Sequence, residues 1–445
     1  MVKQIKSKRT VPELTKNDRK IYKYLIAFPI IALAIKIIIM FNIPNGGWYG
    51  ADGENYTAGV DGLLSSGFYS KESKLSYWPA GYPLLLWPLA EISVSKFYYL
   101  VSFLQSIFYA YATFFLTRSV SKSSLKKFAF ALSLILCFNP TLSLSTLAVG
   151  YEAPIASCLM MTTALFITYG NYQVGRMFWL AIFSTSSWFA LAIFMQPRFL
   201  LVGAFFFLFW AFSLGKIKLI VSILLVSGTV MAIGPAVMIF RNIEVIEQAK
   251  ISTNLGVTMA IGAGDSTSGG YARSGPEVPC QPTPPANAPT DSQKVKCVLK
   301  WYLQNPLKTL KLSFNKTQYF WSPWSGPLAN GTMARNPWLK IAPTQSIKKS
   351  QEGAKFVFGV PGKVISYCWL IGQLIFLFWG YRELLKMGTF EKVVANMTLL
   401  PIVISWLISI ATIGDHRFRI PTMSLSLFLQ VVGFMALRKK VAKAL

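Results

Sequence analysis

Long apolar runs recur along the chain and are separated by short polar connections, most of which are basic. An α-helix needs about 20 apolar residues to cross the hydrocarbon core of a bilayer. The pattern therefore predicts an all-α polytopic integral membrane protein with about ten transmembrane helices. The predicted spans are residues 22–42, 97–117, 128–145, 153–169, 177–196, 199–214, 219–240, 363–381, 393–413 and 421–437.

Two connections, 43–96 and 241–362, are much longer than the others. Because loops carry function more often than buried scaffold does, we expect the active groups in these two segments and in the helix ends beside them. The predicted organisation is a basic N-terminus (1–21), a transmembrane module that includes loop 43–96 (22–240), an outer segment (241–362) and a C-terminal transmembrane module with a polar tail (363–445).

The distribution of basic residues predicts the orientation of the spans. With a cytoplasmic N-terminus, the inner segments carry 21 Lys and Arg residues, whereas the outer connections apart from 241–362 carry few. By the positive-inside rule, both termini lie in the cytoplasm and both long segments lie on the outer face of the plasma membrane. The same bias accounts for the net charge of +27, so no nucleic-acid partner is expected. The first apolar run is too long for a cleavable signal peptide and is interpreted as the first span.

Cysteine and histidine usage limits the chemistry. Cys280 and Cys297 both fall in the outer segment, where an oxidising compartment would let them form a disulfide. The sequence leaves open whether they are bonded or are free thiols. The chain has one histidine and no Cys/His cluster, which argues against zinc or iron chemistry. No cofactor is expected, and another divalent metal stays open.

The first long loop holds two acidic residues, Asp52 and Glu54, among Gly, Trp and Tyr residues a few positions beyond the first span. A carboxylate outside the membrane can deprotonate an attacking hydroxyl or amine, and we choose Asp52 for that role. Its structural alternative is an Asx turn or helix cap in a Gly-rich loop. Glu54 is interpreted as a supporting or partner carboxylate.

Four arginines, Arg198, Arg241, Arg417 and Arg419, lie just outside the predicted outer ends of spans. Charges this close to hydrocarbon are costly unless they are paired, which favours a functional role such as binding a phosphate. Simple snorkelling at the interface is the alternative. Of the two arginines that flank Phe418, we expect only one to face a bound donor, and we favour Arg419.

Five separated stretches carry a resemblance to a known family. They are Asp52-Gly-Glu54 followed by Trp78-Pro-Ala-Gly-Tyr-Pro83; Asn139-Pro with Glu152; Gln196-Pro-Arg198; Arg241-Asn242 followed by Ile251-Ser-Thr-Asn-Leu-Gly256, Gly262 and Gly269; and Gly414-Asp-His-Arg417-Phe-Arg419-Ile-Pro421. In order and spacing they resemble the GT-C fold glycosyltransferases that use polyprenyl-phosphate sugars, the bacterial relatives of protein O-mannosyltransferases and of the lipid A aminoarabinose transferase. Where that family has a basic residue before paired prolines, this chain has Tyr77-Trp78.

The resemblance implies a GT-C-like helical bundle that moves a sugar from a polyprenyl-phosphate donor to a lipid, glycan or protein acceptor on the outer face. It also implies inversion at the anomeric carbon and no nucleotide. Membrane lipids are the further expected partner. Supporting roles at the site are predicted for Glu152, His416 and Tyr82, with Glu152 either pairing with an arginine or binding sugar.

Two other functions remain open from sequence. A GT-C-like ligase or polymerase that uses a diphosphate-linked oligosaccharide would also need arginines near the membrane. A lipid or solute transporter would use a similar number of spans, but transporters usually show paired repeats and charges near mid-membrane. The charges of this chain gather at one face instead.

Overall fold

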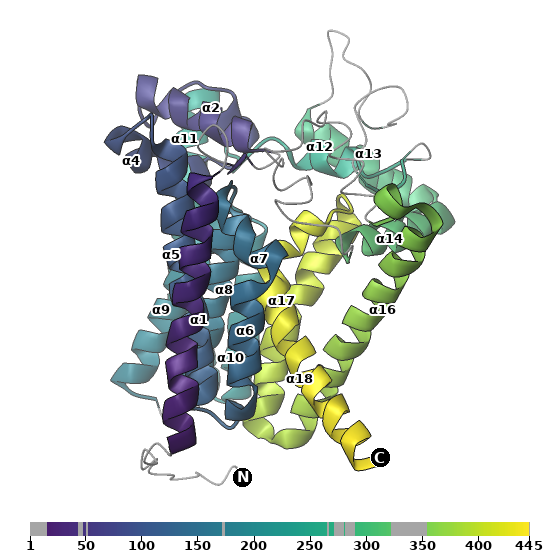
Figure 1. Cartoon of the computed structure of the whole chain (residues 1–445). Coiled ribbons are helices and arrows are strands. Elements are labelled where there is room, and N and C mark those ends of the chain that lie inside the picture. Colours follow the sequence, from purple (N-terminus) through teal and green to yellow (C-terminus); the bar gives the residue numbers. More distant parts are fainter. Residues whose placement is uncertain are drawn as a thin grey trace.

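The computed structural model describes residues 16–42, 48–49, 52–170, 174–264, 267–270, 280, 290–321 and 354–444. Its body is a bundle of long helices (Figure 1). These helices are α1 (Lys16–Phe41), α5 (Phe97–Ser121), α6 (Ala129–Phe138), α8 (Glu152–Tyr169), α9 (Arg176–Met195), α10 (Phe199–Ser213), α11 (Ile217–Ile246), α16 (Ala354–Met387), α17 (Thr389–Ala411) and α18 (Ile420–Ala444).

Shorter elements gather mainly at one end of the bundle, opposite the start of α1 and the end of α18 (Figure 1). They are β1 (Trp48–Tyr49), α2 (Gly53–Ser66), α3 (Lys74–Tyr77), α4 (Gly81–Ile92), α7 (Pro140–Leu144), η3 (Ser145–Leu147), β2 (Ala148–Val149), α12 (Leu255–Ala260), α13 (Asp291–Gln304), α14 (Pro306–Phe320) and η5 (His416–Phe418). One further turn, η2 (Lys126–Phe128), leads into α6.

Nine of the ten predicted spans each fall on one helix and the tenth, 128–145, falls on a bent pair; the all-α membrane architecture is confirmed. Among the described residues, seven helices are long and apolar enough to cross a bilayer, and an eighth crossing is a pair bent by 49°. That bend divides the predicted span 128–145 at Asn139, whose side chain accepts a hydrogen bond from the backbone N–H of Leu142 at 2.9 Å and so starts α7. The following Pro140 has no N–H to continue α6.

Helix α8 is the most deeply buried span: 89% of its apolar window is buried, against 28% for α1 and for α11. Its Ala, Ser, Thr and Cys residues allow neighbouring helices to approach closely, as small residues do in membrane bundles. The first residue of α8 is Glu152, so the central helix of the bundle carries a carboxylate at the end where α2 and α12 lie.

Two helices of the outer segment follow one another closely: α13 ends at Gln304 and α14 begins at Pro306, with Asn305 between them. Cys280 and Cys297 form a disulfide with a Cα–Cα distance of 5.7 Å, which settles the open alternative in favour of the bond. It ties the loop before α13 to that helix.

Glycines of the fourth resembling stretch are required by close approach. A Cβ at Gly262 would collide with the backbone carbonyl of Thr412, and one at Gly256 would collide with the carbonyl of Asp291. The backbone N–H of Gly414 donates to the carbonyl of Gly269 at 2.9 Å. This stretch therefore packs the outer segment against the chain that leads from α17 into η5.

Candidate active site

A two-stranded parallel pairing brings Asp52 and Glu152 together. β1 pairs with β2 in a register that matches Tyr49 with Val149. Asp52 and Glu152 each follow their paired residue by the same distance along the chain, and each stands at the start of a helix, α2 or α8. Parallel pairing places both helix starts at the same edge, so residues far apart in sequence become neighbours.

Arg417 of η5 joins these carboxylates. Its Nη1 pairs with Asp52 Oδ2, its Nε pairs with Glu152 Oε1, and its Nη2 donates to the hydroxyl of Tyr56 at 3.3 Å. Asp52 occupies the N-cap position of α2, but its side chain makes no capping hydrogen bond to that helix and pairs with Arg417 instead. The second carboxylate on Arg417 is Glu152, and Glu54 instead lies exposed in the first turn of α2.

The electrostatics of this cluster hold Arg417 as a cation. Burial alone would lower the pKa of Arg417, but the charges of Asp52 and Glu152 outweigh it and hold that pKa well above its usual value. The side chains of Arg417 and Asp52 are 14% and 15% exposed, whereas Glu152 is completely buried. A small molecule arriving at this end of the bundle would therefore meet Asp52 and Arg417, with Glu152 behind them.

Arg198, in the turn between α9 and α10, lies beside this cluster. Its guanidinium stands 4.0 Å above the ring centroid of Phe418 and 5.7 Å from that of Tyr151. Burial lowers its pKa. Its Nε and Nη2 atoms are buried and have no hydrogen-bond partner among the described residues. Buried charged donors left unpaired are costly, so this edge of Arg198 is suited to an anionic ligand.

Arg419 points away from the two carboxylates. Its Nη1 donates to Gln373 Oε1 of α16 at 2.9 Å, and its guanidinium lies 5.7 Å from the ring centroid of Trp321. Burial lowers the pKa of Arg419 to about 9. The two arginines that flank Phe418 thus serve different elements, and the one that meets the outer-loop carboxylate is Arg417.

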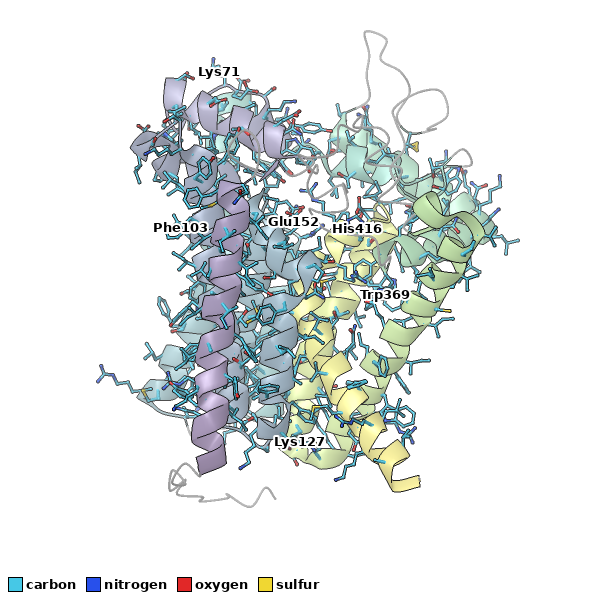
Figure 2. All side chains as sticks on the ribbon, in the orientation of Figure 1. Lys71, Phe103, Lys127, Glu152, Trp369 and His416 are labelled. Carbon is cyan, nitrogen blue, oxygen red and sulfur yellow. A yellow bond between two sulfur atoms is a disulfide. The ribbon has the colours of Figure 1, made fainter. Side chains whose placement is uncertain are left out.

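His416 is buried as a neutral imidazole next to this turn. Its Nδ1 lies 3.2 Å from Asp415 Oδ1, yet burial lowers its pKa to about 4. Figure 2 labels His416 and Glu152 toward the end of the bundle that carries α2, and Lys127 toward the opposite end. His416 is the first residue of η5, so its burial fixes the turn that carries Arg417.

The predicted phosphate ligand Arg241 is fully buried and has its donors occupied by the protein. Its guanidinium donates to the carbonyls of Phe68, Ser70 and Leu75, and the Asn242 amide donates to the Lys250 carbonyl at 2.8 Å. In this conformation Arg241 anchors the outer loop to the end of α11, which is a structural role.

Tyr82 forms part of the aromatic wall of the site. Its ring meets the rings of Tyr56 and Tyr151 edge to face, with centroids 5.1 Å and 6.5 Å away. Tyr56, one helical turn after Asp52, was open from sequence as either a sugar-stacking or an ordinary interfacial aromatic residue, and it lies in this wall. Tyr151 stands directly before Glu152, and no sequence pattern pointed to it.

Lys316 of α14 is a second residue that sequence reasoning missed. Its Nζ donates to the carbonyls of Thr412 and Ile410, at 2.7 Å and 2.9 Å, and to the hydroxyl of Tyr302 at 2.9 Å. Burial lowers the pKa of Lys316 to about 7. These carbonyls end α17 immediately before η5, so Lys316 fixes the chain that leads to Arg417.

Neither the known family models nor the curated proteins contain a match to this chain. Two solved structures of an Archaeoglobus fulgidus oligosaccharyltransferase are similar in fold. One, tethered with an acceptor peptide that contains the NVT sequon, has a TM-score of 0.51 at 12% identity over 94% of this chain. The other, AglB with an inhibitory peptide and a dolichol-phosphate, has a TM-score of 0.49 at 11% identity over 95% of this chain.

The matched region is only about half of each solved chain, 50% and 52%. At this identity the likeness shows the fold alone, which is the helical bundle described above. The chain is therefore a multi-pass membrane protein with the GT-C fold of membrane glycosyltransferases.

Proposed function

We propose that this protein transfers a sugar from a polyprenyl-phosphate-linked donor to a hydroxyl or amine of an acceptor lipid, glycan or protein. The observation that carries the proposal is the cluster of Asp52, Arg417 and Glu152, with the unpartnered edge of Arg198 beside it, in a GT-C fold. The cluster combines a partly exposed carboxylate, that of Asp52, with the buried guanidinium of Arg198, whose Nε and Nη2 have no partner among the described residues.

Asp52 is the proposed general base. The acceptor oxygen or nitrogen attacks the anomeric carbon from the side opposite the phosphate, its proton passes to Asp52, and the bond from the anomeric carbon to the phosphate oxygen breaks with inversion. The polyprenyl phosphate leaves with the electron pair of that bond. Proton transfer to a positioned base contributes about 10²–10⁴-fold to such rates.

Arg198 is the proposed ligand of the departing phosphate. Its free Nε and Nη2 donors form the planar fork that phosphate oxygens accept, in a buried environment that strengthens charge interactions. Arg417 is the proposed positioning residue for Asp52, because both side chains are joined and Glu152 holds the guanidinium from behind. Glu54 and Arg419 have no direct role in this proposed mechanism.

The site is proposed to face the outer side of the plasma membrane, with both termini in the cytoplasm. The Lys and Arg residues of the short connections at the end of the bundle opposite α2 support this orientation, because the positive-inside rule applies to short connections. The placement of the charged cluster at one end of the bundle favours a transferase over a transporter, whose substrate site would lie near mid-membrane.

The test is turnover by the full-length protein in nanodiscs, supplied with radiolabelled polyprenyl-phosphate sugar and envelope extract as the acceptor source. Asp52→Asn should lower transfer by about 10²–10⁴-fold while donor binding persists. Arg198→Gln should instead weaken donor binding. Asp61→Asn, at an exposed position of α2, is the matched control and should behave as wild type.

Wild-type transfer by a folded Asp52→Asn protein would refute the base assignment. Turnover of a diphosphate-linked oligosaccharide, with no turnover of the monophosphate donor, would replace the proposal by the ligase alternative.

A further inference from the structure

The helices α13 and α14 expose large apolar side chains along one face each. On α13 these are Leu299 and Leu303, four residues apart; on α14 they are Leu307, Leu310 and Phe314, at spacings of three and four. Leu303, Leu307, Leu310 and Phe314 are 83%, 81%, 68% and 62% exposed. We name these five residues the α13–α14 stripe. Residues at these spacings share one helix face, so the exposure is a continuous apolar strip on each helix.

The opposite faces of the two helices hold them to the protein. Val298 of α13 and Phe320 of α14 are completely buried, and Leu312 and Lys316 of α14 are nearly so. The stripe is therefore not a helix face that the fold has failed to pack. It is the outward face of two amphipathic helices whose inward face is already in contact with the bundle.

The charge around the stripe is almost entirely positive. Residues 290–321 contain six lysines and one acidic residue, Asp291, and the Asp291 carboxylate already accepts the backbone N–H of Gly256. Lys296 and Lys300 fall beside the stripe on α13, and Lys308 and Lys311 fall beside it on α14, because each lies within about a third of a helical turn of a stripe residue. Exposed leucines flanked by lysines fit an anionic lipid surface.

The position of α14 agrees with that partner. Thr317 of α14 accepts a hydrogen bond from Trp406 Nε1 of α17 at 3.1 Å, and Gln318 donates to the hydroxyl of Tyr367 of α16 at 3.0 Å. Figure 1 shows α14 beside the end of α16 that lies toward α12 and α13. Since α17 is apolar and long enough to cross a membrane, α14 lies at the depth where the end of α17 meets the headgroups.

We propose that α13 and α14 form a docking surface for an anionic lipid membrane, with the stripe in the acyl region of the outer leaflet and Lys296, Lys300, Lys308 and Lys311 at the headgroup phosphates. Because Lys316 on the inward face of α14 holds the carbonyls before η5, the lipid surface also fixes the height of the turn that carries Arg417.

A fluorescent label tests the burial of the stripe in lipid. The full-length Cys368→Ser protein, with its disulfide kept oxidised, receives an environment-sensitive label at Leu307→Cys, at Leu310→Cys or at the exposed control Ser65→Cys of α2. In nanodiscs that contain brominated lipid, both stripe labels should be quenched strongly and the Ser65→Cys label weakly. Equal quenching at all three positions would overturn the proposal.

The choice of anionic lipid is tested separately. Nanodiscs of phosphatidylcholine and phosphatidylglycerol are compared by counting phosphatidylglycerol molecules that remain bound in native mass spectrometry. Each lysine near a charged surface contributes about 1 kcal/mol, so Lys308→Gln and Lys311→Gln should each lower the preference about fivefold. Lys122→Gln, near the opposite end of the bundle, is the control and should leave the preference for phosphatidylglycerol unchanged. An unchanged preference in the α14 variants would refute the lysine assignment, and crosslinking of Leu307→Cys between two copies would replace the membrane by a dimer interface.

Discussion

Replacing Arg417 by lysine tests whether the planar fork is needed, because lysine keeps the charge and loses two of the three contacts. Arg417 reaches Asp52, Glu152 and Tyr56 with three different nitrogens, and a single lysine Nζ cannot reach all three. The residue left behind is Glu152, which is completely buried. Breaking a buried ion pair and leaving one partner uncompensated costs about 3–5 kcal/mol.

That free energy sets the expected size of the effect. If at least half of this free energy raises the barrier to transfer by misplacing Asp52, the rate of transfer should fall by at least about 10- to 70-fold, since each 1.36 kcal/mol is tenfold in rate. The remainder should appear as a lower midpoint of thermal unfolding. Both quantities are measured on the same nanodisc sample, with transfer assayed at saturating donor so that weakened donor binding does not mimic the loss.

Arg419→Lys is the matched comparison, two residues away on the same turn. Lysine can still donate to Gln373 Oε1, and neither Asp52 nor Glu152 loses its partner, so transfer should stay within about tenfold of wild type. The reasoning fails if Arg417→Lys transfers sugar normally. It also fails if Arg419→Lys transfers sugar more slowly than Arg417→Lys does. That result would place the phosphate site at Arg419, the residue that the sequence alone favoured.

Three further outcomes are expected. The buried His416 has a pKa of about 4, below its unfolded value near 6.5, so its contribution to stability is complete above pH 6.5 and is lost as the pH falls toward 4. The loss of unfolding free energy over this pH range is up to about 3 kcal/mol. His416→Gln should therefore flatten the dependence of stability on pH at the acid side. Lys316→Met should leave two backbone carbonyls without a donor at about 1–3 kcal/mol each and should speed hydrogen exchange in residues 412–419. Gly262→Ala should lower the thermal midpoint because its Cβ meets a backbone carbonyl, whereas Gly228→Ala, which meets nothing, should not.

The helices were predictable because the bilayer makes a simple demand on sequence. A helix that crosses the membrane needs a long apolar run; nine of the ten runs fall on single helices, and seven helices of the described residues qualify as crossings. What the runs could not predict was local geometry: the bend at Asn139 and the break at Asn305-Pro306 depend on a cap and on prolines, which leave hydrophobicity almost unchanged. The disulfide was open from sequence, since two cysteines in one loop fix no Cα–Cα distance.

The site was predictable in its membership and not in its pairing. Asp52 and Arg417 were both expected at the outer ends of spans, but 365 residues separate them, and no local pattern shows that they touch. The sequence favoured Arg419 among the candidate arginines, but it could not show the environment of any of the four. Their environments separate them: Arg241 is satisfied by loop carbonyls, and Arg198 keeps two buried donors without a partner among the described residues.

The residues that sequence reasoning missed or assigned elsewhere have a common effect on the two chain segments that meet at the site. Arg241 holds the loop that follows α2, the helix that Asp52 opens, and Lys316 holds the chain just before Arg417. Gly262 lets the outer segment lie directly against that same chain. Burying a guanidinium and an ammonium group is costly unless each meets several acceptors, and here each does. Both cations thus restrain the segments that carry Asp52 and Arg417, so that these two side chains meet in a fixed geometry, which is the preorganisation that the proposed transfer would need.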